Sequence, residues 1–401
     1  MTETTPTAAI HGPPLSKIMA GKRPTFMVHR SYNGGARLPE VFNELSVSHG
    51  DKLGLGAVVR MTNTNPEKAA AFMSTHSRVP LRMLDPELHH APNSVFEQKE
   101  LKATALKWPF LAEIPAQPSK PWVRQVLKAQ LDTGATVLLS ASGWVHDINA
   151  PISMKKQMQF VAESRQLAGS RDMMVNLTLD YRWLTESPLR DLLFETIVEQ
   201  TERHWYLRFY WPIIATRYGQ LLEWAILEGY KELVALCADE EKVLFLPNVG
   251  LSGWVATALG AAGFSTGQSW PEQAFARQQV MASRKGVQRA PAIPRFYEPT
   301  MLHTTEYVEH LRLENLAGHL AEDDTFALEI QTDGHQSELA GLHYLVSAGN
   351  LQAQLSTRSP RSVARKEVRR ASGFLETLGR TGQPAGPNRP QHLPLWLKLL
   401  A

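Results

Sequence analysis

The chain of 401 residues contains a single cysteine, Cys237, within the apolar run ELVALCADE. One cysteine can form neither an internal disulfide nor a cysteine zinc cluster. The opening segment, MTETTPTAAIHGPPLSKIMAGKRP, has no apolar stretch of the kind found in secretory signals. No apolar run approaches the roughly 20 residues that cross a membrane. We therefore expect a cytoplasmic protein that does not associate with membranes.

Neither sign of charge dominates the composition. The chain has 42 Lys and Arg against 39 Asp and Glu, a net charge of +3 that does not by itself indicate nucleic-acid binding. Hydrophobic residues make up 43% and charged residues 20%, an ordinary globular balance. The basic residues gather near the C-terminus, where residues 351–401 hold nine Lys and Arg and only two Asp and Glu. A basic surface is expected there.

Strand-like and helix-like segments alternate eight times between about Thr25 and Ser283. For example, DMMVNLTLD precedes SPLRDLLFETIVEQTE, and the last pair is GFSTGQSW followed by PEQAFARQQVMAS. Such alternation implies parallel strands joined by right-handed crossovers, and eight units in about 260 residues match a (β/α)8 barrel. A doubly wound open sheet is the alternative, but no GxGxxG turn follows the first strand. We predict an α/β fold of the (β/α)8 TIM-barrel type.

The same pattern divides the chain into three parts. Residues 1–23 are Thr- and Pro-rich and predict a flexible arm, and residues 24–284 predict the barrel, with a Pro-punctuated insertion at about 86–121 after the third strand. Residues 285–401 predict a mostly helical, basic C-terminal extension. It begins with a loop, KGVQRAPAIPRFYEPTML.

The stretch HWYLRFYWPII places Arg208 in the middle of the sixth strand. Because side chains alternate along a strand, Tyr206, Arg208 and Tyr210 share the face opposite Trp205, Leu207, Phe209 and Trp211. The preceding strand divides in the same way, with Asn176, Thr178 and Asp180 opposite Val175, Leu177 and Leu179. We predict that helices cover the apolar faces and that the polar faces line the barrel lumen, with Arg208 near Asp180. An ion pair that merely fills the lumen is the alternative.

Active sites of such barrels form at the C-terminal ends of the strands. Near these ends, Asp180 is the candidate nucleophile or oxocarbenium stabiliser, and His146 or Asp147 the candidate acid–base partner. The candidate substrate-binding residues are Arg30, Arg60, Arg82, Arg182, Arg208, Tyr210, Asn248 and Trp183. Arginines form forked bonds with phosphate and aromatic rings stack on bases, so this set suits a nucleotide or a nucleic-acid end.

Several chemistries lack their residues in this sequence. Schiff-base and pyridoxal chemistry need a lysine inside the site, and Lys52 and Lys242 fall at strand beginnings. A metal-dependent hydrolase needs clustered histidines, whereas His29 and His146 are isolated. We therefore expect no metal and no cofactor.

Two glycine-containing turns are candidates for phosphate binding. PNVGLSGW places Gly250, Ser252 and Gly253 before a helix, where backbone N–H groups bind anions, and FSTGQSW adds Thr266 and Gly267. The alternative is an ordinary glycine turn in which Ser252 is the helix N-cap.

These residues predict an enzyme acting at the barrel mouth on a phosphorylated, ring-bearing substrate, with base or glycosyl transfer or hydrolysis as the specific reaction. The alternative is a non-catalytic component that binds nucleic acid or protein through the basic helix SPRSVARKEVRRASGFLETL. Arg361, Arg365 and Arg369 fall at helical spacing in this segment and form one positive stripe. A solvated helix face would give the same pattern.

Overall fold

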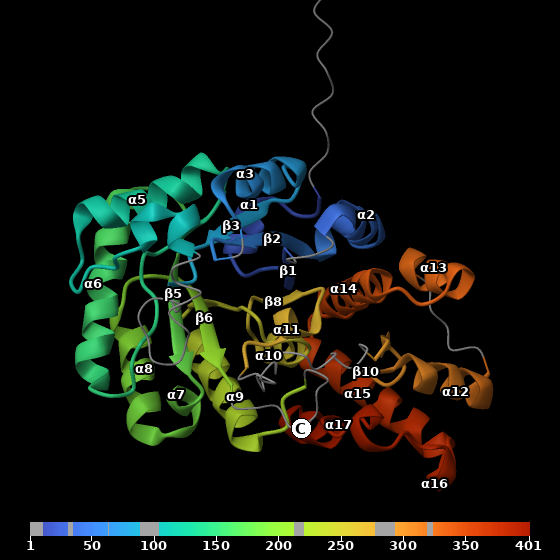
Figure 1. The fold of residues 1–401 in the computed structure, drawn as a ribbon. Coiled ribbons are helices and arrows are strands. Elements are labelled where there is room, and N and C mark those ends of the chain that lie inside the picture. The colour runs from blue at the N-terminus through green and yellow to red at the C-terminus, as the bar shows by residue number, and fades with distance from the viewer. Residues whose placement is uncertain are drawn as a thin grey trace, which may run out of the picture.

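The computed structural model describes residues 11–30, 35–62, 64–88, 104–211, 220–276, 293–318 and 324–401. Its main sheet contains eight parallel strands in the order β3-β2-β1-β8-β7-β6-β5-β4. They are β1 (Thr25–His29), β2 (Gly54–Arg60), β3 (Leu81–Asp85), β4 (Leu138–Leu139), β5 (Met173–Asp180), β6 (His204–Tyr210), β7 (Val243–Leu246) and β8 (Gly263–Gly267). The two edges meet where the Thr136 N–H donates to the Arg82 carbonyl at 2.9 Å. The sheet is a nearly closed barrel, which confirms the predicted (β/α)8 fold (Figure 1).

Helices follow the first seven strands and form the outer layer. They are α2 (Leu38–His49), α3 (Pro66–Thr75), α5 (Lys120–Asp132), α6 (Ala150–Ala168), α7 (Arg182–Thr185), α8 (Ser187–Glu199), α9 (Trp224–Asp239) and α10 (Ser252–Leu259). Short 3₁₀ turns lie at Gly35–Arg37, Gly50–Lys52, Pro109–Leu111 and Gly386–Asn388. Helix α3 shows how such helices begin, because the Asn65 side chain accepts from the Lys68 N–H at 2.9 Å and Pro66 occupies the first turn.

Apolar residues form two separate layers on the two faces of the sheet. The alternation predicted for β5 and β6 is present, since Leu177 and Leu207 pack in the outer layer beneath the helices, whereas Tyr206 packs in the lumen. Lumen residues of this apolar layer include Met27, Val58, Met83, Leu139, Met174 and Phe245. Helix α1 (Leu15–Met19) closes the amino end of the barrel, where Ile18 lies next to Gly54 at the start of β2, and Ile18 and Met19 are buried against the lumen residues. Part of the stretch predicted as a flexible arm therefore packs on the barrel.

Only the beginning of the helix expected after the eighth strand lies within the described residues, and it is shorter than predicted there. Helix α11 covers only Trp270–Gln273, and Ala274 and Ala276 then form β-bridges with Val249 and Trp211. The rest of the predicted helix, from residue 277, lies outside the described residues, as does much of the predicted insertion, at 89–103.

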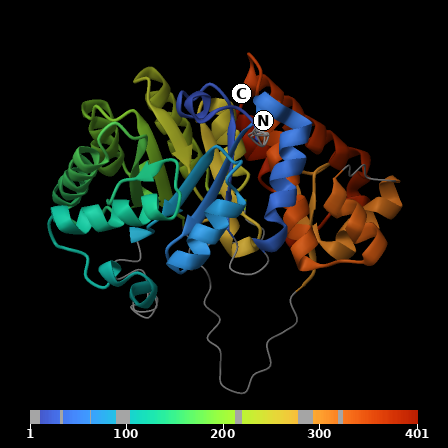
Figure 2. The ribbon, with the colours of Figure 1, turned by 90° about the horizontal axis from the view of Figure 1, so that it is seen from above.

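Helix α14 (Ser337–Gln354) occupies the position of the eighth barrel helix instead. At one end a Cβ on Gly341 would lie 2.4 Å from Gln268 Cγ, just beyond β8. At the other end the Gln352 amide donates to the Thr25 carbonyl at 3.2 Å, at the start of β1. The helix thus runs antiparallel to β8 and β1, and Gly349 contacts Leu45 of α2 (Figures 1 and 2).

The C-terminal region lies to one side of the barrel, next to α2 and α10 (Figure 2). It is mostly helical, with α12 (Tyr307–Ala317), α13 (Thr325–Asp333), α15 (Pro360–Thr377), α16 (Gly379–Gly382) and α17 (Leu393–Leu399). The predicted loop at its beginning is partly wrong, because β9 (Arg295–Glu298) and β10 (His303–Glu306) form an antiparallel hairpin there. The hairpin packs against α14, so it joins this region to the barrel wall.

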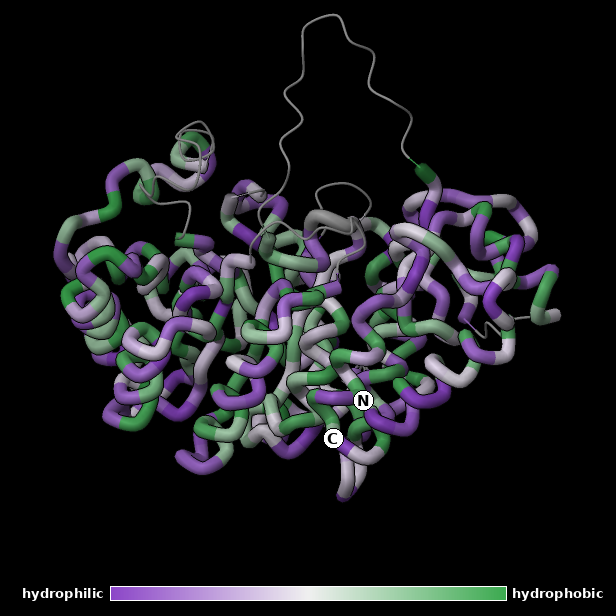
Figure 3. Tube along the Cα trace, turned by 90° about the horizontal axis from the view of Figure 1, so that it is seen from below, coloured by the Kyte–Doolittle hydropathy of each residue, from purple (hydrophilic) through white to green (hydrophobic). Residues whose placement is uncertain are grey.

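The periphery is amphipathic, and its helices carry both hydrophilic and hydrophobic segments (Figure 3). Among the described residues, no helix combines the length and the apolar character that crossing a lipid bilayer would need. Cys237 is buried in α9, and this burial raises the pKa of its thiol to about 12. A thiol of that kind is a packing residue and not a nucleophile.

Candidate active site at the barrel mouth

Arg208 is buried in the lumen, just below the carboxyl ends of the strands. Its guanidinium forms an ion pair with Asp85 and donates to Thr178 Oγ1 and to Asn248 Oδ1, both at 3.3 Å. Asp85 ends β3, three strands away from β6 around the barrel, so this pair spans the lumen. The prediction that Arg208 lies in the lumen is correct.

The predicted partner of Arg208 is wrong. In the parallel register Arg208 lies opposite Thr178, while Asp180 lies opposite Tyr210, nearer the mouth. The Asp180 carboxylate forms an ion pair with Arg182, whereas Arg208 forms its ion pair with Asp85.

Burial strongly affects both members of the lumen pair. It raises the pKa of the Asp85 carboxyl, and the neighbouring guanidinium of Arg208 opposes that change. Burial lowers the pKa of Arg208, but Asp85, Tyr206 and Glu87 together outweigh burial and the pKa is raised. Nearby, His29 Nε2 and Ser265 Oγ share a hydrogen bond of 2.6 Å. Burial and the charge of Arg60 hold the pKa of His29 well below its usual value. His29 is therefore neutral and does not carry charge at the mouth.

A second arginine, Arg60, ends β2 and lies between two carboxylates. Its Nη1 is 3.5 Å from Glu87 Oε1, and its Nη2 is 3.4 Å from Glu272 Oε1. Gly267 makes room for Glu272, because a Cβ on Gly267 would lie 2.3 Å from Glu272 Cβ. Asn248, with a positive φ of 54°, donates to the Glu272 carbonyl at 3.2 Å and so connects Glu272 to Arg208.

Arg30, which follows β1, is half-buried and, unlike Arg208 and Arg60, bonds a hydroxyl and not a carboxylate in the described part of the chain. Its Nη1 donates to Thr64 Oγ1 at 3.3 Å, and among the described residues it forms no ion pair. Burial lowers its pKa, with Glu272 opposing. Since an arginine keeps its charge, Arg30 is a cation at the mouth without a direct carboxylate partner.

On the far side of the barrel, Arg182 joins two carboxylates that the sequence singled out. Its Nη1 lies 2.7 Å from Asp147 Oδ2, and its Nε lies 2.9 Å from Asp180 Oδ1. The three side chains are partly exposed, at 38% for Arg182, 22% for Asp147 and 14% for Asp180. We call these three residues the Asp–Arg–Asp cluster.

Two further candidates lie beside the Asp–Arg–Asp cluster. Tyr210 is the register partner of Asp180, and its ring centroid lies 5.0 Å from that of Phe275 and 6.1 Å from that of Trp144. His146 precedes Asp147 at the surface. Partial desolvation lowers the pKa of His146, Asp147 opposes this, and Lys156 lowers it further. An imidazole beside the Asp147 carboxylate can act in proton transfer.

The structure places other predicted site residues away from the mouth. Arg82 lies at the amino end of β3, where its Nη1 donates to the carbonyls of Ser77 and Val79. Trp183 is fully buried in the outer apolar layer and offers no face to a ligand. Thr266 points outward, and its hydroxyl bonds that of Tyr344 in α14 at 3.0 Å.

The glycine turn before α10 also differs from a phosphate site. A Cβ on Gly253 would lie 2.4 Å from Phe264 Cβ, so this glycine permits close packing of helix against strand. Ser252 is buried and is not the N-cap, which is Leu251. Gly250 has a positive φ of 50°, which fits the alternative of an ordinary turn glycine. Gly267 serves the placement of Glu272.

Sequence reasoning missed the acids of the lumen. Asp85 was visible at the end of the third strand, but nothing in the sequence connects it to Arg208 across the barrel. Glu272 follows Ser269 by three residues and forms a capping box with it, so the sequence pattern indicates a helix start and not a site residue. Glu87 lies in the predicted insertion.

Comparisons with known proteins give no family for this chain. No protein-family model matches it, and no curated protein matches it either. Within the part of the chain that the structure describes, no three His, Cys, Asp or Glu side chains are grouped so that they could hold a metal ion.

Proposed function

We propose that this protein is a cytoplasmic enzyme that acts on a phosphorylated, ring-bearing substrate such as a nucleotide, by transfer or hydrolysis at a glycosidic carbon. The observation that carries the proposal is the Asp–Arg–Asp cluster, in which two carboxylates share one guanidinium at the barrel mouth. Paired carboxylates perform this chemistry in many glycosidases. The mouth is also where barrel enzymes place their active sites.

Each residue of the cluster has a role in this proposal. Asp180 attacks the glycosidic carbon or stabilises its developing positive charge, and Arg182 orients the Asp180 carboxylate through their 2.9 Å contact. Asp147 or His146 protonates the leaving group and later accepts a proton from the incoming nucleophile. Tyr210 stacks on the ring of the substrate.

Arg30 binds the phosphate in this proposal. It is the cation of the mouth without an ion-pair partner among the described residues, and a guanidinium binds phosphate with forked hydrogen bonds. By strand order β1 and β5 lie on opposite sides of the barrel. A substrate that contacts both Arg30 and Asp180 must therefore be elongated, with its phosphate and its ring at opposite ends, as in a nucleotide.

The test is a calorimetric titration with nucleosides, nucleoside monophosphates and ribose 5-phosphate, followed by product analysis. We expect Asp180→Asn to abolish turnover and keep binding, and Arg30→Gln to weaken the monophosphate about tenfold and leave the nucleoside unchanged. Asp172→Asn is the matched control, since Asp172 is exposed at the opposite end of the same strand. The proposal fails if no nucleotide binds, or if Asp180→Asn and Asp172→Asn behave alike.

A second candidate function is nucleic-acid binding by α15. Arg361 and Arg369 are exposed on this helix and Arg365 is half-buried, and none of the three forms an ion pair within the described residues. The helix packs through Ala364, Val368 and Ala371, which leaves the basic stripe beside its buried face. Such a stripe would bind phosphates without reading bases.

The second candidate is tested by replacing Arg361, Arg365 and Arg369 with alanine. The control replaces Lys120, Arg124 and Lys128 with alanine. These residues are exposed on α5 at the same spacing, so their replacement removes the same amount of positive charge. If the stripe binds nucleic acid, the first triple variant loses a salt-dependent affinity that the control keeps. Equal losses would indicate a nonspecific effect of net charge. No salt-dependent affinity in the unaltered protein would leave α15 as a solvated surface.

A further inference from the structure

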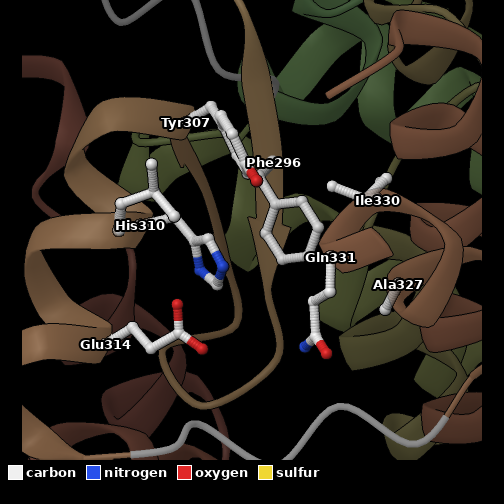
Figure 4. Close-up of a pocket in the computed structure, with 8 residues that line it drawn as sticks. Phe296, Tyr307, His310, Glu314, Ala327, Ile330 and Gln331 are labelled. Atoms are coloured by element: carbon white, nitrogen blue, oxygen red, sulfur yellow. The ribbon is translucent and has the colours of Figure 1, made fainter. Parts of the chain in front are cut away.

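A cavity of about 280 Å³ lies in the C-terminal region, away from the barrel mouth. Phe296 of β9 forms its back wall, between a set of α12 side chains and a set of α13 side chains (Figure 4). The α12 set includes Tyr307, His310 and Glu314, and the α13 set includes Ala327, Ile330 and Gln331. Both sets repeat at helical spacing, so each helix turns one face to the cavity.

The back wall is a stack of rings held in place by buried carboxylates. The His310 ring lies 4.2 Å from that of Phe296 at an angle of 30°, and 5.7 Å from that of Tyr307 at 22°. Phe296 stacks in turn on His343, at 4.4 Å and 15°. His310 Nδ1 is 3.0 Å from Glu298 Oε2, and Glu298 is fully buried.

His343 is fixed from both sides of its ring. Its Nδ1 bonds the Asp324 carboxylate, and its Nε2 donates to the Tyr297 carbonyl at 2.8 Å. Asp324 in turn accepts from the Phe326 and Ala327 N–H groups at the start of α13, both at 3.0 Å. The wall is therefore organised before any ligand arrives, which reduces the entropy lost on binding.

The charges around the cavity favour a cation. Among the described residues that line it there is one carboxylate, Glu314, and no lysine or arginine. The carboxylate of Glu298 lies behind His310 and bonds its ring. Figure 4 shows the Glu314 carboxylate beneath the His310 ring, on the side of the cavity.

The size of the cavity limits the ligand further. Pockets for drug-sized ligands occupy roughly 300–1,000 Å³, so this cavity suits a molecule with one ring or a short apolar body. Ala327 and Ile330 provide apolar contact for that body, and the Gln331 amide offers one donor and one acceptor. We propose that this cavity binds a small organic cation, with the charged group on Glu314 and the apolar body against the Tyr307–Phe296 wall.

The test uses three probes that share one ring and differ in charge: phenethylamine, 2-phenylethanol and phenylacetate. Binding to the full-length protein is measured by calorimetry and by saturation-transfer NMR. We expect phenethylamine to bind about tenfold more tightly than the alcohol, because the alcohol cannot form a charge-assisted bond, and we expect the acid not to bind. Equal affinities for amine and alcohol, or no binding of any probe, would overturn the proposal.

Two pairs of variants locate the site. Glu314→Gln should remove the preference for the amine, whereas Glu309→Gln should keep it, because the Glu309 carboxylate bonds Arg312 and does not line the cavity. Tyr307→Leu should weaken phenethylamine roughly two- to fivefold, whereas Tyr307→Phe keeps the ring and should keep the affinity. The tyrosine pair tests the same site if Glu314→Gln does not fold. Unchanged affinity in Glu314→Gln and in Tyr307→Leu would contradict the assignment.

Discussion

Replacement of Arg208 by methionine should cost a large part of the stability of this protein. Arg208 is 1% exposed and Asp85 is fully buried, so the variant leaves a carboxylate in the lumen without its partner. Breaking a buried ion pair on one side costs about 3–5 kcal/mol. The hydrogen bonds to Thr178 and Asn248 are lost as well, at about 1 kcal/mol each, so the upper part of that range is expected.

The double variant Asp85→Leu/Arg208→Met separates the charge from the packing. Replacing both members by apolar side chains removes the cost of an unpaired buried charge, so the double variant should lie within about 2 kcal/mol of the unaltered protein. The two single effects should therefore be strongly non-additive. Lys128→Met is the surface control, because Lys128 is 67% exposed and pairs with an exposed Asp132. Its effect should stay within about 0.5 kcal/mol.

Urea unfolding followed by tryptophan fluorescence measures all five proteins, including the single variant Asp85→Leu, since the chain has ten tryptophans. An Arg208→Met effect below about 1 kcal/mol would refute the reasoning, because such a value is typical of exposed pairs. Simple addition of the two single effects in the double variant would also refute it. Either result would mean that the charge pair is hydrated and that the lumen is not a low-dielectric site.

Three other stability measurements follow from single contacts. Gly253→Ala should destabilise the protein by about 1–3 kcal/mol, because the new Cβ would lie 2.4 Å from Phe264; no effect would mean that α10 does not pack this closely. Gly373→Ala should be neutral or stabilise by up to about 1 kcal/mol, because Gly373 is within α15 with open space around it, and a loss would contradict this. Burial lowers the pKa of His303 from 6.5 to about 4, so the unfolded chain binds the proton first as pH falls. Stability should drop by up to roughly 3 kcal/mol between about pH 6.5 and 4, and His303→Gln should lack this part of the dependence.

The barrel and the orientation of its strands could be predicted because they depend on local pattern. Period-two alternation in β5 and β6 determines which side chains face the helices and which face the lumen. When helices cover one face of a parallel strand and the other face is polar, a closed barrel is the arrangement that places the polar face in a lumen. The position of Arg208 followed from its place in this pattern. Asp147, Asp180 and Arg182 were candidates because they follow β4 and β5, which are neighbours in sequence and in space, but the bonds from Arg182 to both carboxylates were not predicted.

The partners across the lumen could not be predicted in the same way. Asp85 and Arg208 are 123 residues apart in the sequence, and they meet only because the sheet closes with β3 and β6 on facing sides. Glu272 reaches Arg60 only because the chain turns back over the mouth after β8. Such contacts depend on the stagger of the closed sheet, which the alternation of residues does not contain.

The position of the eighth barrel helix could not be assigned from chain order alone. The segment PEQAFARQQVMAS directly follows β8, yet α14, more than 60 residues later, packs at the position of the eighth barrel helix. The composition of α14 indicates that it is a buried helix. Only Glu338 is charged among its 18 residues, and most of its side chains are buried on every side. A helix that is apolar all round must be covered all round. Helix α14 meets that condition between β8 and β1 on one side and β9 on the other, so the C-terminal region supplies a wall of the barrel and stabilises the strands that carry Arg30 and Gly267.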